Sequence, residues 1–255
     1  MNGLNSTAKT FKDSVFRGQH TLPPIFYISI LGTKPTGGKM EVSQAVKQRK
    51  SIRGFLPNPV EDKVLSTLLE KSSRAPSGGN VQPWRIYVIN GSRMDDFKTH
   101  LANFSLSESE YPIYPPKLQE PYRTNRFELG EEMYKLLGIP REDKAARLAN
   151  MAKNYDFFGA PAAFFCFIDR SMGAAQWSDL GMFLQTFMLL AEEAGLGTCP
   201  QEAWAMHHQA VSEFVSAPEN EMIFCGISIG YPDWAQPVNS LESRRMPLEQ
   251  WCTWA

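Results

Sequence analysis

Two polar segments of this chain have the composition of a ligand site, and the first is RKSIRG at residues 49–54. In an extended segment side chains alternate, so Arg49, Ser51 and Arg53 would project to one side and Lys50 and Ile52 to the other. Two guanidinium groups beside a hydroxyl can bind a phosphate or another planar acceptor. For these three residues alone, a solvated basic ridge is the better explanation.

The second segment is RAPSGGNVQPW at residues 74–84. Its residues disfavour a helix, and a plain turn needs only two or three of them. Ser77 and the two glycines let a backbone approach a ligand closely, while the amides of Asn80 and Gln82 match the edge of a heterocycle. Trp84 is better explained as a core residue. Together, the two segments favour a site that binds an anion and forms hydrogen bonds with the edge of a heterocycle.

Other chemical motifs fail their own requirements. GISIG at 226–230 matches the G-x-S-x-G nucleophile elbow, but that motif needs a helix after the serine and a later histidine. Here Tyr231-Pro232 follows, and the last histidine is His208. The four histidines form no metal-binding pair, and neither a Rossmann glycine pattern nor a Walker A sequence occurs. A small residue in a strand is the simpler explanation for Ser228.

The elements that must position these segments alternate without regular βαβ order, which predicts an α+β sandwich of helices around a mixed sheet. Hydrophobic periodicity predicts helices near 41–49, 60–73, 93–103, 127–139, 141–155 and 178–197, and strands at 85–90, 160–169 and 222–230. The helix at 178–197 is apolar nearly all round, as expected for burial on more than one side. It is either a core helix that also meets a partner subunit or the central helix of a monomer.

Composition and length set further limits. The 255 residues have a formal net charge of -1, which gives no reason to expect nucleic acid or an anionic membrane as partner. The apolar run at 25–31 is too short to span a bilayer and is a poor signal peptide, so we expect a cytoplasmic protein. Residues 1–39 are expected to form an N-terminal arm or extension, and 40–255 the functional domain, with an excursion at about 105–155.

Four motifs in order resemble the FMN-dependent nitroreductase family: RKSIRGF, APSGGNVQPW, GLGTCPQEAW and SLESRRMP. The resemblance covers roughly residues 40–255 and is specific for the superfamily, but much less so for substrate. It implies a nitroreductase-like α+β sandwich, with a central mixed or antiparallel sheet surrounded by helices, in a domain-intertwined homodimer. It also implies FMN as cofactor and NAD(P)H as electron donor.

The resemblance assigns the basic residues to the flavin. Arg49 and Ser51 would hold the ribityl phosphate, Arg53 would lie near the pyrimidine edge, and Arg245 would return to the phosphate. Lys50 stands where a second arginine is common. Ser243 stands where some members have a basic phosphate ligand.

The remaining contacts would come from the loop and from the segment after the apolar helix. The partner subunit would supply Pro76, Ser77, Gly78 and Asn80, with Gln82 as a further polar contact. Pro200, Gln201 and Glu202 would line one face of the flavin. The backbone N–H groups of Glu202 and Ala203 would lie near N5 and O4.

The implied reaction is a ping-pong hydride transfer from NAD(P)H through FMN to a nitroaromatic compound or a quinone. No side-chain general acid is evident, so no catalytic residue is assigned. Ene reduction, dehydrogenation or dehalogenation on the same flavin is the alternative, and a flavin-binding sensor without turnover is another. From a different class, the rival is a serine hydrolase using Ser228.

The excursion is long enough to carry function. In one interpretation its aromatic and basic side chains cap the flavin pocket and grip an acidic aromatic substrate such as a nitrobenzoate. In the other it wraps the partner subunit without touching substrate. The side chains concerned are Tyr111, Tyr114, Tyr122, Phe127, Arg123 and Arg126.

Overall fold

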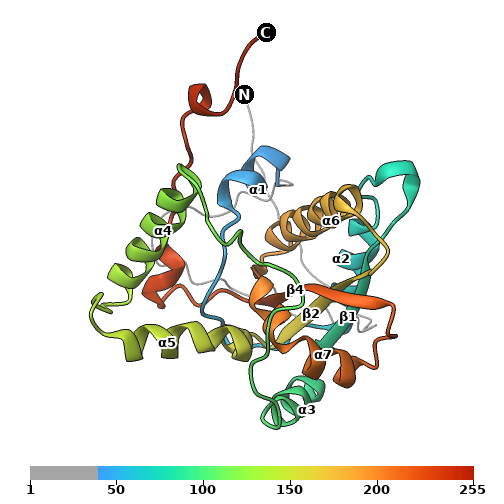
Figure 1. Ribbon diagram of the computed structural model, residues 1–255. Coiled ribbons are helices and arrows are strands. Elements are labelled where there is room, and N and C mark those ends of the chain that lie inside the picture. Colours follow the sequence, from blue (N-terminus) through green and yellow to red (C-terminus); the bar gives the residue numbers. More distant parts are fainter. Residues whose placement is uncertain (1–39) are drawn as a thin grey trace, which may run out of the picture. The chain divides into compact units, whose positions relative to one another are not determined.

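The computed structural model describes residues 40–255, and the arm expected at 1–39 lies outside the described residues. Within this range seven α-helices and four strands alternate with short 3₁₀ turns (Figure 1). The helices are α1 (Val42–Gln48), α2 (Asp62–Ser72), α3 (Ser92–Leu101), α4 (Tyr122–Leu136), α5 (Lys144–Ala152), α6 (Ala174–Glu193) and α7 (His208–Val215). The strands are β1 (Arg85–Asn90), β2 (Ala162–Asp169), β3 (Gly197–Gln201) and β4 (Glu221–Gly230).

The four strands form one sheet in the order β1-β2-β4-β3, with every neighbouring pair antiparallel. Ser51 adds a parallel bridge to Thr198 of β3. The predicted α+β class with a mixed or antiparallel sheet surrounded by helices is therefore confirmed.

Alternation along β2 separates two apolar cores. Phe164, Cys166 and Ile168 face α2 and α6, where Leu65 of α2 and Phe187 of α6 join the same buried cluster. All five side chains are nearly inaccessible to solvent, so this face of the sheet is fully covered. Figure 1 shows α2 and α6 together on this side.

The other face is more aromatic. Phe165 and Phe167 of β2 pack with Phe97 of α3 and with Trp204, beside α7 (Figure 1). A bulge in β4 at Phe224 changes the alternation, so Ile223 joins this cluster while Cys225, Ile227 and Ile229 beyond the bulge belong to the first core. Burial on both faces explains why β2 is a continuous apolar run.

Most predicted elements match observed ones. The strand at 85–90 is confirmed at both ends, and the observed α1, α2, α3, α6 and β4 overlap their predicted ranges. Helix α4 begins five residues before its predicted start. Strand β3 and helix α7 were not predicted. For β3, the glycine and proline of GTCPQ disguise the strand. No helix within residues 40–255 is long and apolar enough to cross a membrane.

Candidate functional site

The basic segment lies along the free edge of β3. Ile52 donates its N–H to the Thr198 carbonyl at 2.9 Å, which fixes the extended backbone that the sequence predicted. Ile52 is buried, and an added Cβ on Gly197 would lie 2.6 Å from its Cγ1. A glycine at 197 is therefore needed for this close approach, which leaves Arg49, Ser51 and Arg53 half-buried at the edge.

A buried asparagine that the sequence gave no reason to select holds the end of this segment. Asn239 has no exposed surface and accepts the N–H of Arg53 at 2.8 Å. Its amide donates to the carbonyls of Gly54 and Asp233, both at 2.8 Å. These bonds satisfy the amide and hold the backbone at Arg53 and Gly54.

The cations gather at the other end of the segment. Burial lowers the pKa of Arg49, the nearby charge of Arg245 lowers it further, and Glu192 opposes both effects. Lys50 pairs with Glu242 at 3.8 Å. Arg245 donates to the carbonyl and hydroxyl oxygens of Ser243, at 2.8 and 2.6 Å. Two neighbouring guanidinium groups that repel each other form a favourable setting for an anion.

The corner where β3 enters the 3₁₀ turn Glu202–His207 has one side chain placed differently from the expectation. Gln201 is 2% exposed, and its amide points into the protein. The Ser228 hydroxyl donates to Gln201 Oε1 at 2.6 Å, and Gln201 Nε2 donates to the Asn154 carbonyl at 2.7 Å. The side chain of Gln201 therefore does not face a ligand, and only its backbone is left for that role.

This placement also excludes the nucleophile elbow. Ser228 is completely buried, lies inside β4, and is followed by two further strand residues instead of a sharp turn and a helix. The serine-hydrolase interpretation was wrong, because the matching letters do not have the exposed geometry that the motif requires.

The 3₁₀ turn presents backbone donors beside the basic segment. The first N–H groups of a helical turn have no partner within that turn, and here they belong to Glu202 and Ala203. Trp204 anchors the turn against Gly226 of β4, where an added Cβ would lie 2.8 Å from the indole Nε1. Pro200 and Ala203 are half-buried and Glu202 is exposed, so this backbone is accessible.

The loop at 76–82 is held by its own side chains and by one carboxylate. The N–H of Gly78 donates to both oxygens of Asp179 at 3.2 Å, and Asp179 is 3% exposed. The N–H of Gln82 donates to Ser77 Oγ at 3.0 Å, and its side chain donates to the Asn80 carbonyl at 3.2 Å. Ser77 and Gln82 thus brace the loop, while Pro76, Gly78 and Asn80 are exposed.

The chain does not bring this loop to the basic segment. The loop is attached to α6 at Asp179, whereas Arg49 lies near Glu192, thirteen residues further along the same helix. At 1.5 Å per residue these two positions are about 20 Å apart along the helix axis. Within residues 40–255 of one chain, the two segments therefore lie apart and do not form one site.

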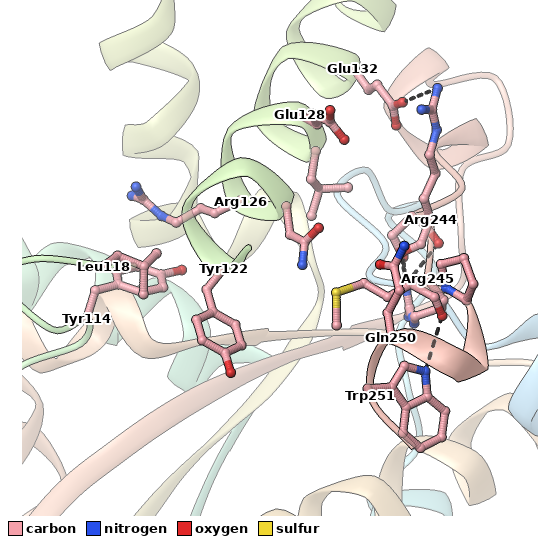
Figure 2. A pocket seen from close by; sticks show the side chains of 15 residues that line it. Tyr114, Leu118, Tyr122, Arg126, Glu128, Glu132, Arg244, Arg245, Gln250 and Trp251 are labelled. Atoms are coloured by element: carbon pink, nitrogen blue, oxygen red, sulfur yellow. Dashed lines mark hydrogen bonds and ion pairs between the residues drawn. The ribbon is translucent and has the colours of Figure 1, made fainter. Parts of the chain in front are cut away.

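The excursion contributes to a third feature, a cavity of about 890 Å³ between α4 and residues 243–251. In Figure 2, Tyr114 and Arg126 lie at one side of it, Arg245 and Trp251 at the other, and Tyr122 between them. The Arg126 guanidinium lies 4.3 Å from the centre of the Tyr114 ring. Three of the six predicted excursion side chains therefore share one cavity with a predicted phosphate ligand.

The other three excursion side chains lie elsewhere. Tyr111 donates to the Phe224 carbonyl and packs edge-on against Trp177. Arg123 pairs with Glu120 at 2.6 Å, and Phe127 does not line the cavity. Contact with an acidic aromatic substrate remains a prediction for Tyr114, Tyr122 and Arg126.

Comparison with known proteins agrees with the resemblance. Residues 46–231 match the model of the nitroreductase family. The chain is 37% identical to a 4-nitrobenzoate reductase of Pseudomonas putida, over 80% of this chain and 89% of the relative. It is 33% identical to a nitrobenzene nitroreductase of Ectopseudomonas oleovorans, over 83% and 96%. A crystal structure described as the FMN and NADPH-dependent nitroreductase NfnB from sphigopyxis sp. strain HMH superimposes with a TM-score of 0.81 at 39% identity, covering 85% of this chain and 99% of that one.

Proposed function

This chain belongs to the nitroreductase family, and we propose on that premise that it is an FMN-dependent NAD(P)H oxidoreductase that reduces nitroaromatic compounds. The observation that carries the proposal is that the basic segment pairs with the edge strand β3, which leads directly into the 3₁₀ turn that begins at Glu202, and that the charge of Arg245 acts on Arg49. Quinones are proposed as further acceptors, as expected from the sequence.

The residues present fit FMN. A phosphate needs cations and hydroxyl donors, and Arg49, Arg245 and Ser51 offer both in one place. The ring of FMN has carbonyl and nitrogen acceptors, which suit the guanidinium of Arg53 and the backbone donors of the 3₁₀ turn. The whole set is rich in donors, as an acceptor-rich anion requires.

The proposed roles follow from these positions. Arg49, Ser51 and Arg245 hold the phosphate, and Lys50 adds positive charge beside them although it also pairs with Glu242. Arg53 serves the pyrimidine edge, with its backbone fixed by Asn239. The backbone from 200 to 203 lies against one face of the ring and supplies the N–H donors.

When bound, FMN supplies the hydride chemistry between NAD(P)H and the acceptor. The protein's part is to bind it, leave one face open and favour negative charge on the ring. A cation 4 Å from that charge contributes about 4 kcal/mol at an effective dielectric constant of 20, and less after desolvation, which is the role we propose for Arg53. Burial raises the pKa of Cys199 to about 11, so this nearby thiol stays protonated at neutral pH and no side-chain catalyst is assigned.

We further propose that the enzyme is a homodimer whose partner subunit supplies the loop at 76–82. The loop lies about 20 Å along α6 from the basic segment of its own chain, so a two-fold related copy is the natural source of that wall. Exposed apolar side chains on α1 and α6 support a buried interface there: Val42, Val46 and Met182. The cytoplasm is the proposed location, since all four cysteines are free thiols.

A visible spectrum tests the function directly. The purified protein should be yellow, its flavin band should bleach with NAD(P)H under nitrogen, and the band should return when a nitroarene is added. A folded protein that stays colourless after incubation with excess FMN would contradict the proposal. Bound FMN that NAD(P)H cannot reduce would favour the sensor alternative.

Mixed dimers test the shared site. Arg49→Ala and Asn80→Ala should each abolish most activity, because each removes one wall of every site. Heterodimers isolated through two different tags combine both lesions in one site and leave the other intact, so each dimer should regain about half of the wild-type activity. If one chain builds its whole site, every site in the heterodimer keeps a lesion, and no recovery will occur.

A further inference from the structure

Gln201 is the centre of a buried hydrogen-bond network at the end of β3, beneath the backbone proposed to contact the flavin. Ser228 of β4 donates to its Oε1 at 2.6 Å. Its Nε2 donates to the carbonyl and to the side-chain oxygen of Asn154, at 2.7 and 3.2 Å. Asn154 in turn donates to the Met151 carbonyl at 2.9 Å, which connects the network to the end of α5.

These hydrogen bonds allow only one orientation of the Gln201 amide. A flipped amide would direct its oxygen at the Asn154 carbonyl, and two acceptors would then face each other without a proton. Ser228 has no exposed surface and Gln201 is 2% exposed, so water cannot replace a lost partner at low cost. The side chain is therefore held from both ends.

The fixed side chain of Gln201 restricts the orientation of the neighbouring peptide group. The N–H of Glu202 belongs to the peptide that follows Gln201, so its direction depends on the Gln201 backbone, which has φ -141° and ψ 91°. The same residue is paired with Gly226 at the end of β3, where the sheet stops and the 3₁₀ turn begins. Strand pairing holds the backbone of Gln201 where it faces Gly226. The hydrogen bonds of its side-chain amide hold the same residue where strand pairing ends.

We propose that Gln201, locked by Ser228 and Asn154, is a positioning residue that aims the N–H groups of Glu202 and Ala203 at bound FMN. This inference rests on the proposed function. It gives a role to the buried serine of the GISIG motif, which acts through Gln201 and never touches the ligand. It also explains why an amide residue lies inside the corner instead of facing the flavin.

Ser228→Ala removes the hydroxyl donor without adding bulk, and Ser72→Ala is the matched control. Ser72 is equally buried and donates at the same distance, 2.6 Å, but its acceptor is Leu68 inside α2. The dissociation constants of oxidised and reduced FMN are measured for both variants, together with thermal unfolding of the flavin-free proteins. Both variants delete one buried hydroxyl, but Ser228→Ala should lower flavin-free stability more, because it leaves Gln201 Oε1 without a donor whereas the Leu68 carbonyl keeps its helical N–H partner.

Only Ser228→Ala should change flavin binding, raising the dissociation constant of oxidised FMN about fivefold to tenfold, the worth of one hydrogen bond. The constant for reduced FMN should rise less, because the ring nitrogen that takes up hydride accepts a hydrogen bond only in the oxidised form. Ser72→Ala should leave both constants within about twofold of wild type.

Equal flavin constants in Ser228→Ala and Ser72→Ala would overturn the inference. A second test uses Gln201→Met, in which adding Ser228→Ala should weaken FMN binding no further if the serine acts through the amide. Fully additive losses in the double variant would contradict that route. If the wild-type protein itself binds no FMN, the proposed function fails, and that result differs from a failure of the positioning role alone.

Discussion

The corner of β3 with its 3₁₀ turn and the loop at 76–82 are proposed walls of one site, yet they are built in opposite ways. The corner is paired to the sheet and anchored by Trp204, which is buried over Gly226. The loop is largely exposed, and Gly79, Asn80 and Gln82 have φ of 57°, 59° and 52°. Such left-handed backbone is costly for residues other than glycine and persists only where neighbouring contacts hold it.

In the proposed shared site, one wall is held rigidly by the core of its own chain, and the other wall is held by only a few local contacts. The corner keeps its geometry through the core of its own chain, so its N–H donors are preorganised. The loop depends on Asp179, Ser77 and a few local hydrogen bonds, so fewer contacts hold it in place. We therefore expect damage to the corner to appear in stability and flavin binding, and damage to the loop to appear mainly in turnover.

The largest effect is expected from Gly226→Ala. Its new Cβ would lie 2.8 Å from Trp204 Nε1, so the turn must shift or the core must strain, at a cost of about 2 to 3 kcal/mol in unfolding free energy. FMN binding should fail with it. The same change at Gly130 of α4 meets nothing within 4 Å and should stabilise by up to about 1 kcal/mol. Urea unfolding and flavin titration measure both, and equal stability of the two variants would remove the packing argument.

Asp179→Ala tests the loop alone. It leaves the Gly78 N–H without its carboxylate acceptor, and a hydrogen bond to a charged group is worth about 1.5 to 3 kcal/mol. Because Gly78 is exposed, water can replace the lost acceptor, so flavin-free stability should fall by less than this amount, whereas kcat/KM should fall about tenfold or more. Asp179→Asn keeps an acceptor and should retain most of the activity.

In mixed dimers with Arg49→Ala, the Asp179→Ala chain should restore one site. An unchanged kcat/KM in Asp179→Ala would show that the anchor is dispensable.

The smallest expected effect is a pH dependence of stability that arises from Glu192 of α6, near Arg49. Burial raises the pKa of Glu192 in the folded protein above its ordinary value of 4.5, despite the nearby charges of Arg49 and Lys50. A raised folded-state pKa contributes stability that is fully present below pH 4.5 and is lost as the pH rises through the folded pKa.

Glu192→Gln should therefore match wild type near pH 4 and be more stable at pH 7, by less than about 1 kcal/mol since the group is partly solvated. Urea unfolding of the flavin-free proteins across that range measures the difference. Glu193→Gln is the control, because Glu193 is the exposed neighbour on the same helix. A wild-type protein that gains stability over Glu192→Gln with rising pH would reverse the sign and refute the argument.

The features of the site that depend on local sequence pattern could be predicted from the sequence. Period-two alternation in RKSIRG predicted an extended segment with Ile52 turned inward, and Ile52 is 2% exposed. The glycine and amide content of the loop at 76–82 indicated an unusual backbone, and its left-handed residues agree with that expectation. Periodicity also located α6, which contacts the loop at Asp179 and lies near Arg49 at Glu192.

Long-range pairing was beyond the reach of local pattern. Asn239 lies 186 positions from Arg53, and Asp179 lies 101 from Gly78, so nothing near either residue reveals its partner. Gln201 was expected at the ligand because its neighbours resemble a family motif. Its side chain turned inward once β4 brought Ser228 beside it.

The amino-acid sequence by itself determined which segments are helical, extended or sharply turned, and which of them carry cations and amides. These properties follow from side-chain type and spacing over a few residues. Only the tertiary structure decided which polar groups face a ligand and which satisfy one another inside the protein. That choice depends on burial, because a polar atom removed from water must find a partner wherever the packed chain places one.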